Sequence, residues 1–132
     1  RAVLEGVSYG LNDSLSLMRG LGIEPDRVIL SGGGARSSFW RQMLADVFLA
    51  RCQLVNATEG AAYGAALLAA VGAGVHESVE TACATCIQVT DQIDAGPDKE
   101  VYAEFYPRFQ ALYPALKEEF AALADLSEKH AG

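Results

Sequence analysis

Residues 28–40 read Val-Ile-Leu-Ser-Gly-Gly-Gly-Ala-Arg-Ser-Ser-Phe-Trp, so an apolar run meets three glycines and, shortly after, two serines. The run predicts a short buried strand over Val28–Leu30. Glycine permits positive φ and carries no Cβ, so a ligand can lie directly on the main chain of Gly32–Gly34. Ser37 or Ser38 would cap a helix that begins just beyond, and the free N–H groups of that helix would face the same place. The segment therefore predicts a nucleotide site, with a tight turn that binds no ligand as the alternative.

Helices and short strands alternate on both sides of this segment. The expected elements are a helix through Leu4–Met18 that ends near Gly20 and Gly22, the strand Val28–Leu30, a helix through Phe39–Val47, a strand over Cys52–Val55, and a helix from about Glu59 to Val71 with Thr58 as its candidate cap. A helix between two strands predicts a parallel pair with a right-handed crossover. Because two strands cannot form a parallel sheet with both faces covered, we expect further strands from outside the chain.

The remainder of the chain is expected to be helical around one small strand. The predicted elements are a short helix over His76–Thr85, an edge strand over Ile87–Thr90, a solvated acidic turn from Asp91 that leads into a helix by Glu104, and a final helix with an apolar face from Tyr102 to Leu123. That face is expected to be core packing. Proline removes a backbone donor, so Pro107 and Pro114 are expected to kink or divide the final helix.

The helix after Glu59 carries mainly small side chains. Glycine inside a helix costs about 1 kcal/mol relative to alanine. We therefore expect Gly64 to let another backbone pack closely, which is a structural role and not a ligand contact.

Composition narrows the class of protein. A length of 132 residues with 51% hydrophobic and 20% charged residues fits one soluble globular domain. The net charge of −7 and the scattered basic residues argue against nucleic-acid binding. The longest apolar stretch, 61–75, is too short to span a bilayer, so no membrane partner is expected.

The cysteines and the first residues of the chain bear on its cellular setting. Three cysteines without a framework spacing favour a reducing compartment, and the cytoplasm is the expected location. Polar residues interrupt the first apolar segment, so no signal peptide is predicted. The chain opens at Arg1 as though inside a helix, which predicts a piece of a longer protein.

Several chemical motifs are excluded or weak. A P-loop is excluded because no lysine follows the glycines, and a dinucleotide fingerprint is only partly matched because no acidic residue follows the second strand. The pair Cys83 and Cys86 has no second ligand pair for zinc and ends a helix, so coincidence is favoured. Trp40 is expected to be buried, whereas Arg36 could equally reach a phosphate or be solvated. No nucleophile–base pair is evident, so no catalytic residue is predicted in this chain.

Three segments carry a resemblance to a known family. Residues 30–46, Leu-Ser-Gly-Gly-Gly-Ala-Arg-Ser-Ser-Phe-Trp-Arg-Gln-Met-Leu-Ala-Asp, resemble the adenosine-binding segment of the FGGY carbohydrate kinases, and within that family the xylulokinases. Residues 59–70, Glu-Gly-Ala-Ala-Tyr-Gly-Ala-Ala-Leu-Leu-Ala-Ala, resemble the helix that follows it. The aromatic residues from Tyr102 to Tyr113 are similar to the C-terminal helix of those enzymes. The resemblance covers essentially the whole chain.

The resemblance implies a fold, a domain assignment and a reaction. The fold is an α/β fold, the C-terminal part of an actin-like, ribonuclease-H-like ATPase domain with short parallel strands and several helices. Residues 1–132 would be the nucleotide-side C-terminal domain, without the N-terminal domain that binds sugar and carries the catalytic base. The reaction would be ATP-dependent phosphorylation of a sugar, D-xylulose to D-xylulose 5-phosphate, with Mg²⁺ held mainly by parts outside this chain. This chain alone is therefore expected to be inactive.

The resemblance also implies which residues contact the nucleotide. Gly32, Gly33 and Gly34 would lie along the adenosine and α-phosphate with Ala35 beside them, and Ser37 would lie near the purine or ribose. No metal ligand is expected in the chain. Glycerol, gluconate, ribulose or fuculose remain alternative substrates, and a non-catalytic actin-like interaction module remains an alternative function. A homodimer is left open.

Overall fold

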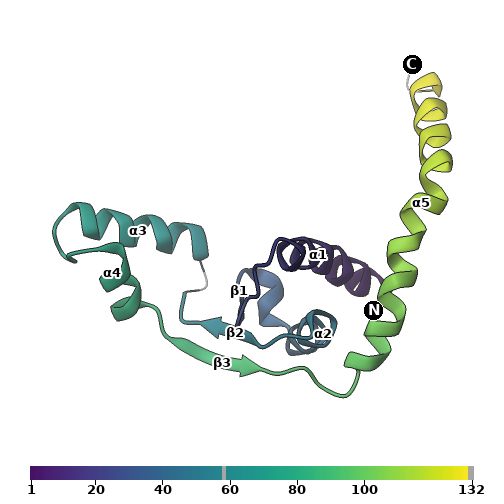
Figure 1. The fold of residues 1–132 in the computed structure, drawn as a ribbon. Helices are drawn as coiled ribbons and strands as arrows, with labels where there is room; N and C mark the ends of the chain where they lie inside the picture. Colours follow the sequence, from purple (N-terminus) through teal and green to yellow (C-terminus); the bar gives the residue numbers. More distant parts are fainter. Residues whose placement is uncertain (58, 131–132) are drawn as a thin grey trace.

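The computed structural model describes residues 1–57 and 59–130. A small sheet lies between a group of three helices, α1, α2 and α5, and a pair of helices, α3 and α4 (Figure 1). The elements are α1 (Ala2–Gly20), β1 (Val28–Leu30), the 3₁₀ turn η1 (Gly33–Arg36), α2 (Ser38–Phe48), β2 (Cys52–Val55), α3 (Gly60–Gly72), α4 (Val79–Cys86), β3 (Val89–Ile93) and α5 (Lys99–His130). The predicted α/β class is confirmed, and the first five predicted helices and strands lie where the sequence pattern places them.

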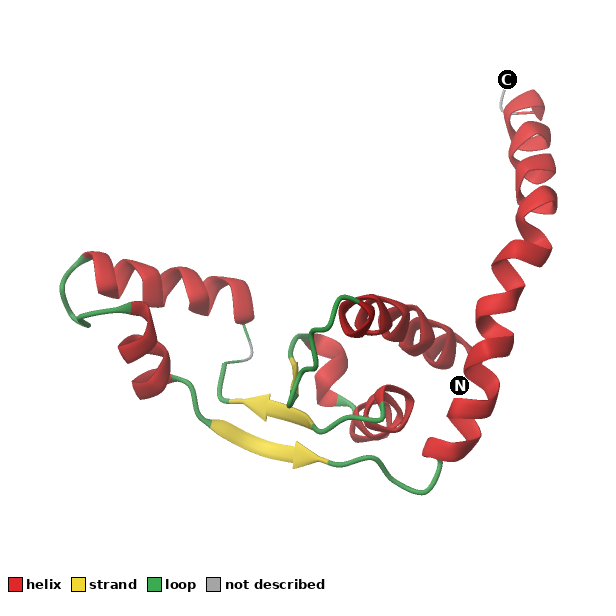
Figure 2. Ribbon diagram, in the orientation of Figure 1, coloured by secondary structure: helices red, strands yellow, loops and turns green. Residues whose placement is uncertain are grey.

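The sheet has the order β1-β2-β3 (Figure 2). Strands β1 and β2 are parallel, with Val28 opposite Cys52 and Leu30 opposite Leu54, as the helix between them predicts. Strand β3 adds to β2 in the antiparallel direction, with Cys52 opposite Ile93. The expected edge strand therefore exists, but it begins two residues later than predicted.

Two expectations about the second half of the chain are corrected. The segment from Asp91 is not a solvated turn, because Asp91–Ile93 completes β3 and only the residues after it turn into α5. For the final helix only one of the two alternatives is wrong: α5 is not divided at Pro107 or Pro114, because it is continuous through both prolines, whereas its axis does bend (Figure 1).

The core lies where α1, α2 and α5 meet the start of β2. Its buried residues are Tyr9, Leu15, Met43, Leu44, Ala45, Val47, Phe48, Cys52 and Tyr102. The aromatic rings of α5 close this core against α1, with the Tyr9 centroid 5.8 Å from Tyr106 and 5.2 Å from Phe109. Five of these nine residues, from Met43 to Phe48, lie in α2.

The apolar face of α5 is core packing only in its first half. Tyr102 is 4% exposed, whereas Tyr113 is 64% and Phe120 50% exposed. From residue 110 onward every described residue of α5 is exposed, and the helix extends away from the sheet (Figure 1). The expectation that the whole face from Tyr102 to Leu123 packs into the core is therefore wrong for its second half.

A polar contact joins α2 to the segment between β3 and α5. The buried carboxylate of Asp46 accepts hydrogen bonds from the backbone N–H of Gly96 and from Nε2 of Gln42, the latter at 3.1 Å. The same Gln42 amide donates to the carbonyl of Asp94 at 3.1 Å. These bonds satisfy backbone groups at the turn that leads into α5, and they fix where that helix begins.

Helices α3 and α4 contact each other and bury little. Leu67 and Ala82 are their buried residues. No atom other than those of its own helix backbone and neighbours lies within 4 Å of a Cβ built on Gly64, so the expected close backbone contact is absent among the described residues. The candidate cap Thr58 lies outside the described residues. None of the described helices combines the length and the apolar character that a membrane span requires.

Candidate functional site

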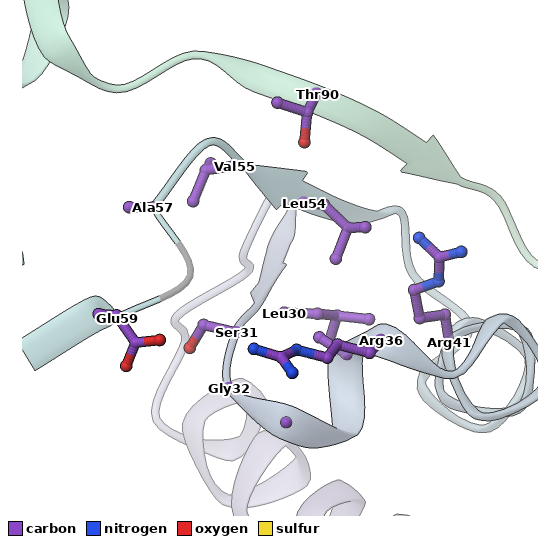
Figure 3. Close-up of a pocket in the computed structure, with 12 residues that line it drawn as sticks. Leu30, Ser31, Gly32, Arg36, Arg41, Leu54, Val55, Ala57, Glu59 and Thr90 are labelled. Carbon is purple, nitrogen blue, oxygen red and sulfur yellow. The ribbon is translucent and has the colours of Figure 1, made fainter.

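A cleft opens at the carboxyl ends of the two parallel strands (Figure 3). Its volume is about 600 Å³, within the range of ligand pockets. Its lining residues are Leu30, Ser31, Gly32, Gly33, Ala35, Arg36, Arg41, Leu54, Val55, Ala57, Glu59 and Thr90. Ligands of open α/β sheets bind outside the carboxyl ends of the strands, so this cleft is the candidate functional site.

The floor of the cleft is main chain without side chains. Gly32 has φ +81° and ψ −175°, a conformation that is essentially restricted to glycine. No atom lies within 4 Å of a Cβ built on Gly32 or Gly33, so both backbones face open space. The N–H of Ala35 donates to the carbonyl of Gly32 at 3.2 Å and closes the turn η1. The local conformation thus leaves a bare surface on which a flat or anionic ligand can rest.

Gly34, the third glycine, faces the opposite side of the turn. A Cβ at this position would lie 2.2 Å from Cζ3 of Trp40, so only glycine lets the indole approach. The indole Nε1 donates to Oγ of Ser8 in α1 at 3.0 Å, and that hydroxyl donates to the carbonyl of Leu4 at 2.8 Å. Gly34 does not line the cleft. Its absent side chain instead allows Trp40 to join the glycine turn to α1.

Ser37 is the N-cap of α2. Its Oγ accepts a hydrogen bond from the N–H of Trp40 at 3.3 Å, which settles the choice between Ser37 and Ser38. Ser37 is not among the lining residues of the cleft. The structure therefore brings Gly32, Gly33 and Ala35 together in the lining of the cleft and leaves Gly34 and Ser37 outside that lining. Contact of these five residues with a nucleotide stays a prediction.

Three charged side chains line the cleft. Arg36 extends from η1 across the glycine turn, and Glu59, the N-cap residue of α3, stands on the other side of Ser31 (Figure 3). Arg41 is held by Asp91 of β3, with Nη1 3.0 Å from Oδ2. Of these residues, sequence reasoning singled out Arg36 but gave no site role to Arg41 or Glu59. The topology could have indicated Glu59, because residues that follow a parallel strand reach the same edge as the glycine turn.

The cysteine motif of α4 lies near one histidine in the part of the chain that the structure describes. Among the described residues, no group of three or more His, Cys, Asp or Glu side chains is placed to hold a metal ion. Cys83 and Cys86 are free thiols in the last turns of α4, and Sγ of Cys86 lies 3.7 Å from Nε2 of His76. This contact of His76 could not be predicted from the sequence, because it depends on the turn between α3 and α4.

Comparison with known proteins defines the family. Residues 1–73 match the C-terminal domain of the FGGY family of carbohydrate kinases. This match covers more than half of the chain, and it includes α1, the glycine turn, α2 and α3. The chain therefore belongs to the FGGY family of carbohydrate kinases.

Two similar curated proteins are named xylulose kinase. The chain is 34% identical to a xylulose kinase of Staphylococcus epidermidis over 96% of its length, and 40% identical to a xylulose kinase of Escherichia coli over 88%. It spans 26% and 24% of these two relatives, so it corresponds to about a quarter of their length.

Solved structures of sugar kinases match the fold of this chain. The chain matches a xylulose kinase from Rhodospirillum rubrum with a TM-score of 0.76 and 34% identity, over 92% of this chain and 25% of that one. A ligand-bound xylulose kinase from Lactobacillus acidophilus matches with a TM-score of 0.84 over 93% of this chain and 25% of that one, at 22% identity. These matches confirm the expected actin-like, ribonuclease-H-like fold class.

Proposed function

We propose that this chain supplies the adenosine-binding half-site of an ATP-dependent sugar kinase. The observation that supports this is the cleft at the carboxyl ends of β1 and β2, floored by the bare main chain of Gly32 and Gly33, in a member of the FGGY family. Gly32, Gly33 and Ala35 lie beneath the adenosine and α-phosphate. Gly34 and Ser37 hold this floor in place through Trp40.

The proposed reaction phosphorylates D-xylulose to D-xylulose 5-phosphate. The C5 hydroxyl oxygen attacks the γ-phosphorus of ATP, and the bond from that phosphorus to the oxygen that bridges the β- and γ-phosphates breaks. ADP leaves, and the hydroxyl proton passes to a base. Such a transfer depends on positioning and charge neutralisation, and fixing the nucleotide is this chain's share of it.

The remaining parts of the machinery lie, on this proposal, outside residues 1–132. The lining residues of the cleft offer one carboxylate, Glu59, and no described group that could hold a metal. The catalytic base, the sugar contacts and most of the Mg²⁺ ligands are proposed to belong to an N-terminal domain, as the resemblance to the FGGY kinases implies, and residues 1–132 to form the nucleotide-side domain. The three free thiols fit a reducing, cytoplasmic setting.

Gluconate is the second candidate substrate. One curated relative, 29% identical over 95% of this chain, is named gluconokinase from Bacillus licheniformis. The xylulose kinases named above are more similar in sequence, so D-xylulose remains the first choice. Sugar contacts outside this chain would decide between the two.

The test measures ADP formation by the intact protein with ATP, Mg²⁺ and a panel of D-xylulose, D-gluconate, glycerol, D-ribulose and L-fuculose. We expect kcat/KM to be highest for D-xylulose. A leucine side chain at Gly33 would fill the space above the floor, so Gly33→Leu should raise KM for ATP at least about tenfold.

The matched control is Gly10→Leu, an exposed glycine of α1 that also has no atom within 4 Å of its Cβ position. It should leave KM for ATP unchanged. Equal KM values for the two variants would contradict the proposed floor, and absence of sugar-dependent ADP formation with every sugar would contradict the kinase.

A further inference from the structure

The cleft carries opposite charges on its two sides. The guanidinium of Arg36 reaches along the glycine turn from η1, whereas the carboxylate of Glu59 approaches Ser31 from the start of α3 (Figure 3). The start of α3 is close to the turn, because a Cβ on Gly60 would lie 3.8 Å from Oγ of Ser31. A ligand on the glycine floor would therefore have a cation at one end and an anion at the other.

Neither of these two charges has a salt-bridge partner in the part of the chain that the structure describes. Arg36 and Glu59 are both exposed, and no ion pair between described residues involves either of them. Arg41, the other cation of the cleft, is already paired with Asp91 at 3.0 Å, and its side chain is only 20% exposed. Arg36 is thus the exposed cation of the cleft that has no ion pair with a described residue, and it can bind an incoming anion without breaking one.

The guanidinium of Arg36 and the carboxylate of Glu59 favour one orientation of a ligand that bears phosphates at one end and hydroxyls at the other. A guanidinium donates hydrogen bonds to phosphate oxygens in a bidentate manner, whereas a carboxylate only accepts and repels phosphate. A carboxylate pairs well with ribose hydroxyls, which donate.

We propose that Arg36 and Glu59 orient the nucleotide on the glycine floor, with Arg36 binding its phosphates and Glu59 accepting hydrogen bonds from its ribose hydroxyls. This inference rests on the proposed function and adds the direction in which the nucleotide lies. The two residues act on binding, and neither is assigned a chemical step.

The test compares nucleotide dissociation constants of the intact protein and its variants by competition. Arg36→Gln should weaken ATP binding about tenfold to a hundredfold and should reduce the advantage of ATP over adenosine by the same factor. Arg36→Lys should recover part of the loss. Glu59→Gln should leave that advantage intact and reduce the preference for ATP over 2′,3′-dideoxy-ATP about tenfold.

Two control variants test whether the effects are specific to the cleft. Arg108→Gln and Glu77→Gln remove exposed charges outside the cleft and should leave all ratios unchanged. Equal weakening of ATP and adenosine binding by Arg36→Gln, or tighter ATP binding in Glu59→Gln, would overturn the orientation. Failure of the unmutated protein to bind ATP would instead overturn the proposed function.

Discussion

At the scale of single residues, the three consecutive glycines have different tasks. Gly32 adopts a backbone conformation that excludes side chains, Gly33 leaves the cleft open, and Gly34 makes room for the Trp40 ring. A glycine run in a sequence can therefore combine a binding surface and a packing contact within a few ångströms.

Gly34→Ala tests the packing task. The new methyl group would overlap the ring of Trp40, which must shift and strain its bond to Ser8, so we expect a loss of about 1–3 kcal/mol in the free energy of unfolding. Urea denaturation followed by circular dichroism measures this loss. Gly33→Ala, where the methyl group meets no atom within 4 Å, should change stability by less than about 0.5 kcal/mol. Equal losses in both variants would contradict the assignment.

The buried thiol of Cys52 predicts a dependence of stability on pH. Burial raises the pKa of Cys52 from 9.0 to about 11. Between these values the unfolded chain releases a proton that the folded chain keeps, so the free energy of unfolding should fall as pH rises above 9, by up to about 2 kcal/mol near pH 11. Burial also raises the pKa values of Tyr9, Tyr102 and Tyr106, which act in the same direction.

Urea denaturation from pH 7 to pH 10.5 measures this slope. Cys52→Ala should flatten it whatever its effect on absolute stability, whereas Cys83→Ala, which removes a partly exposed thiol, should keep the unmutated slope. An unmutated slope in Cys52→Ala would rule out Cys52 as a source of the pH dependence.

At the scale of elements, the junction between α2 and α5 depends on one carboxylate. Asp46→Ala would leave the N–H of Gly96 and the amide of Gln42 without this acceptor, so we expect a loss of about 1–3 kcal/mol. Asp46→Asn keeps one acceptor oxygen and should lose less. The control Asp26→Ala removes an exposed carboxylate before β1 and should have little effect. Thermal unfolding of the three variants measures these losses. Equal stability of Asp46→Ala and Asp26→Ala would contradict the role of Asp46.

The two halves of α5 should differ in stability. Residues up to Phe109 pack on Tyr9, whereas the residues beyond 112 bury no side chain in the described chain. In a polypeptide of residues 1–132, hydrogen exchange should therefore be at least about tenfold slower at the backbone amides of 103–109 than at those of 116–126. Uniform protection along α5 would show that the second half is covered after all.

The elements that the sequence predicts well are those whose pattern is local. The apolar spacing of α1 and of α2 lies within a few turns of helix, and a cap at Ser37 or Ser38 is adjacent to it, so periodicity and capping chemistry predict both helices. Strand β3 carries Asp91 and Gln92, which local propensity assigns to a turn. Their partners Arg41 and Gln53 come from elsewhere in the chain.

The residues of the cleft likewise divide into those with a local pattern and those brought in from elsewhere in the chain. The glycine floor is visible in the sequence because its residues are adjacent. The place of Glu59 and Arg41 on the cleft depends on how α3 and β3 reach the ends of the strands, and that depends on tertiary structure. The continuity of α5 through Pro114 has a similar cause: the helix is solvent-exposed there, so water can satisfy the carbonyl that proline leaves free.

At the scale of the whole molecule, the proposed function divides the reaction between this chain, which would bind the nucleotide, and a separate domain that would carry the catalytic base. On that proposal, residues 1–132 with ATP, Mg²⁺ and D-xylulose should form no ADP above a protein-free control, because the base is expected to lie outside them. Sugar-dependent turnover by this chain alone would mean that the catalytic base lies within it.

Trp40 is the one tryptophan of the chain, and its ring lies against the back of the glycine turn while its Nε1 is bonded to α1. A ligand that settles on the front of that turn would change the surroundings of a single natural fluorophore. Emission from this indole should therefore follow occupancy of the cleft directly, so that titrations need no attached dye.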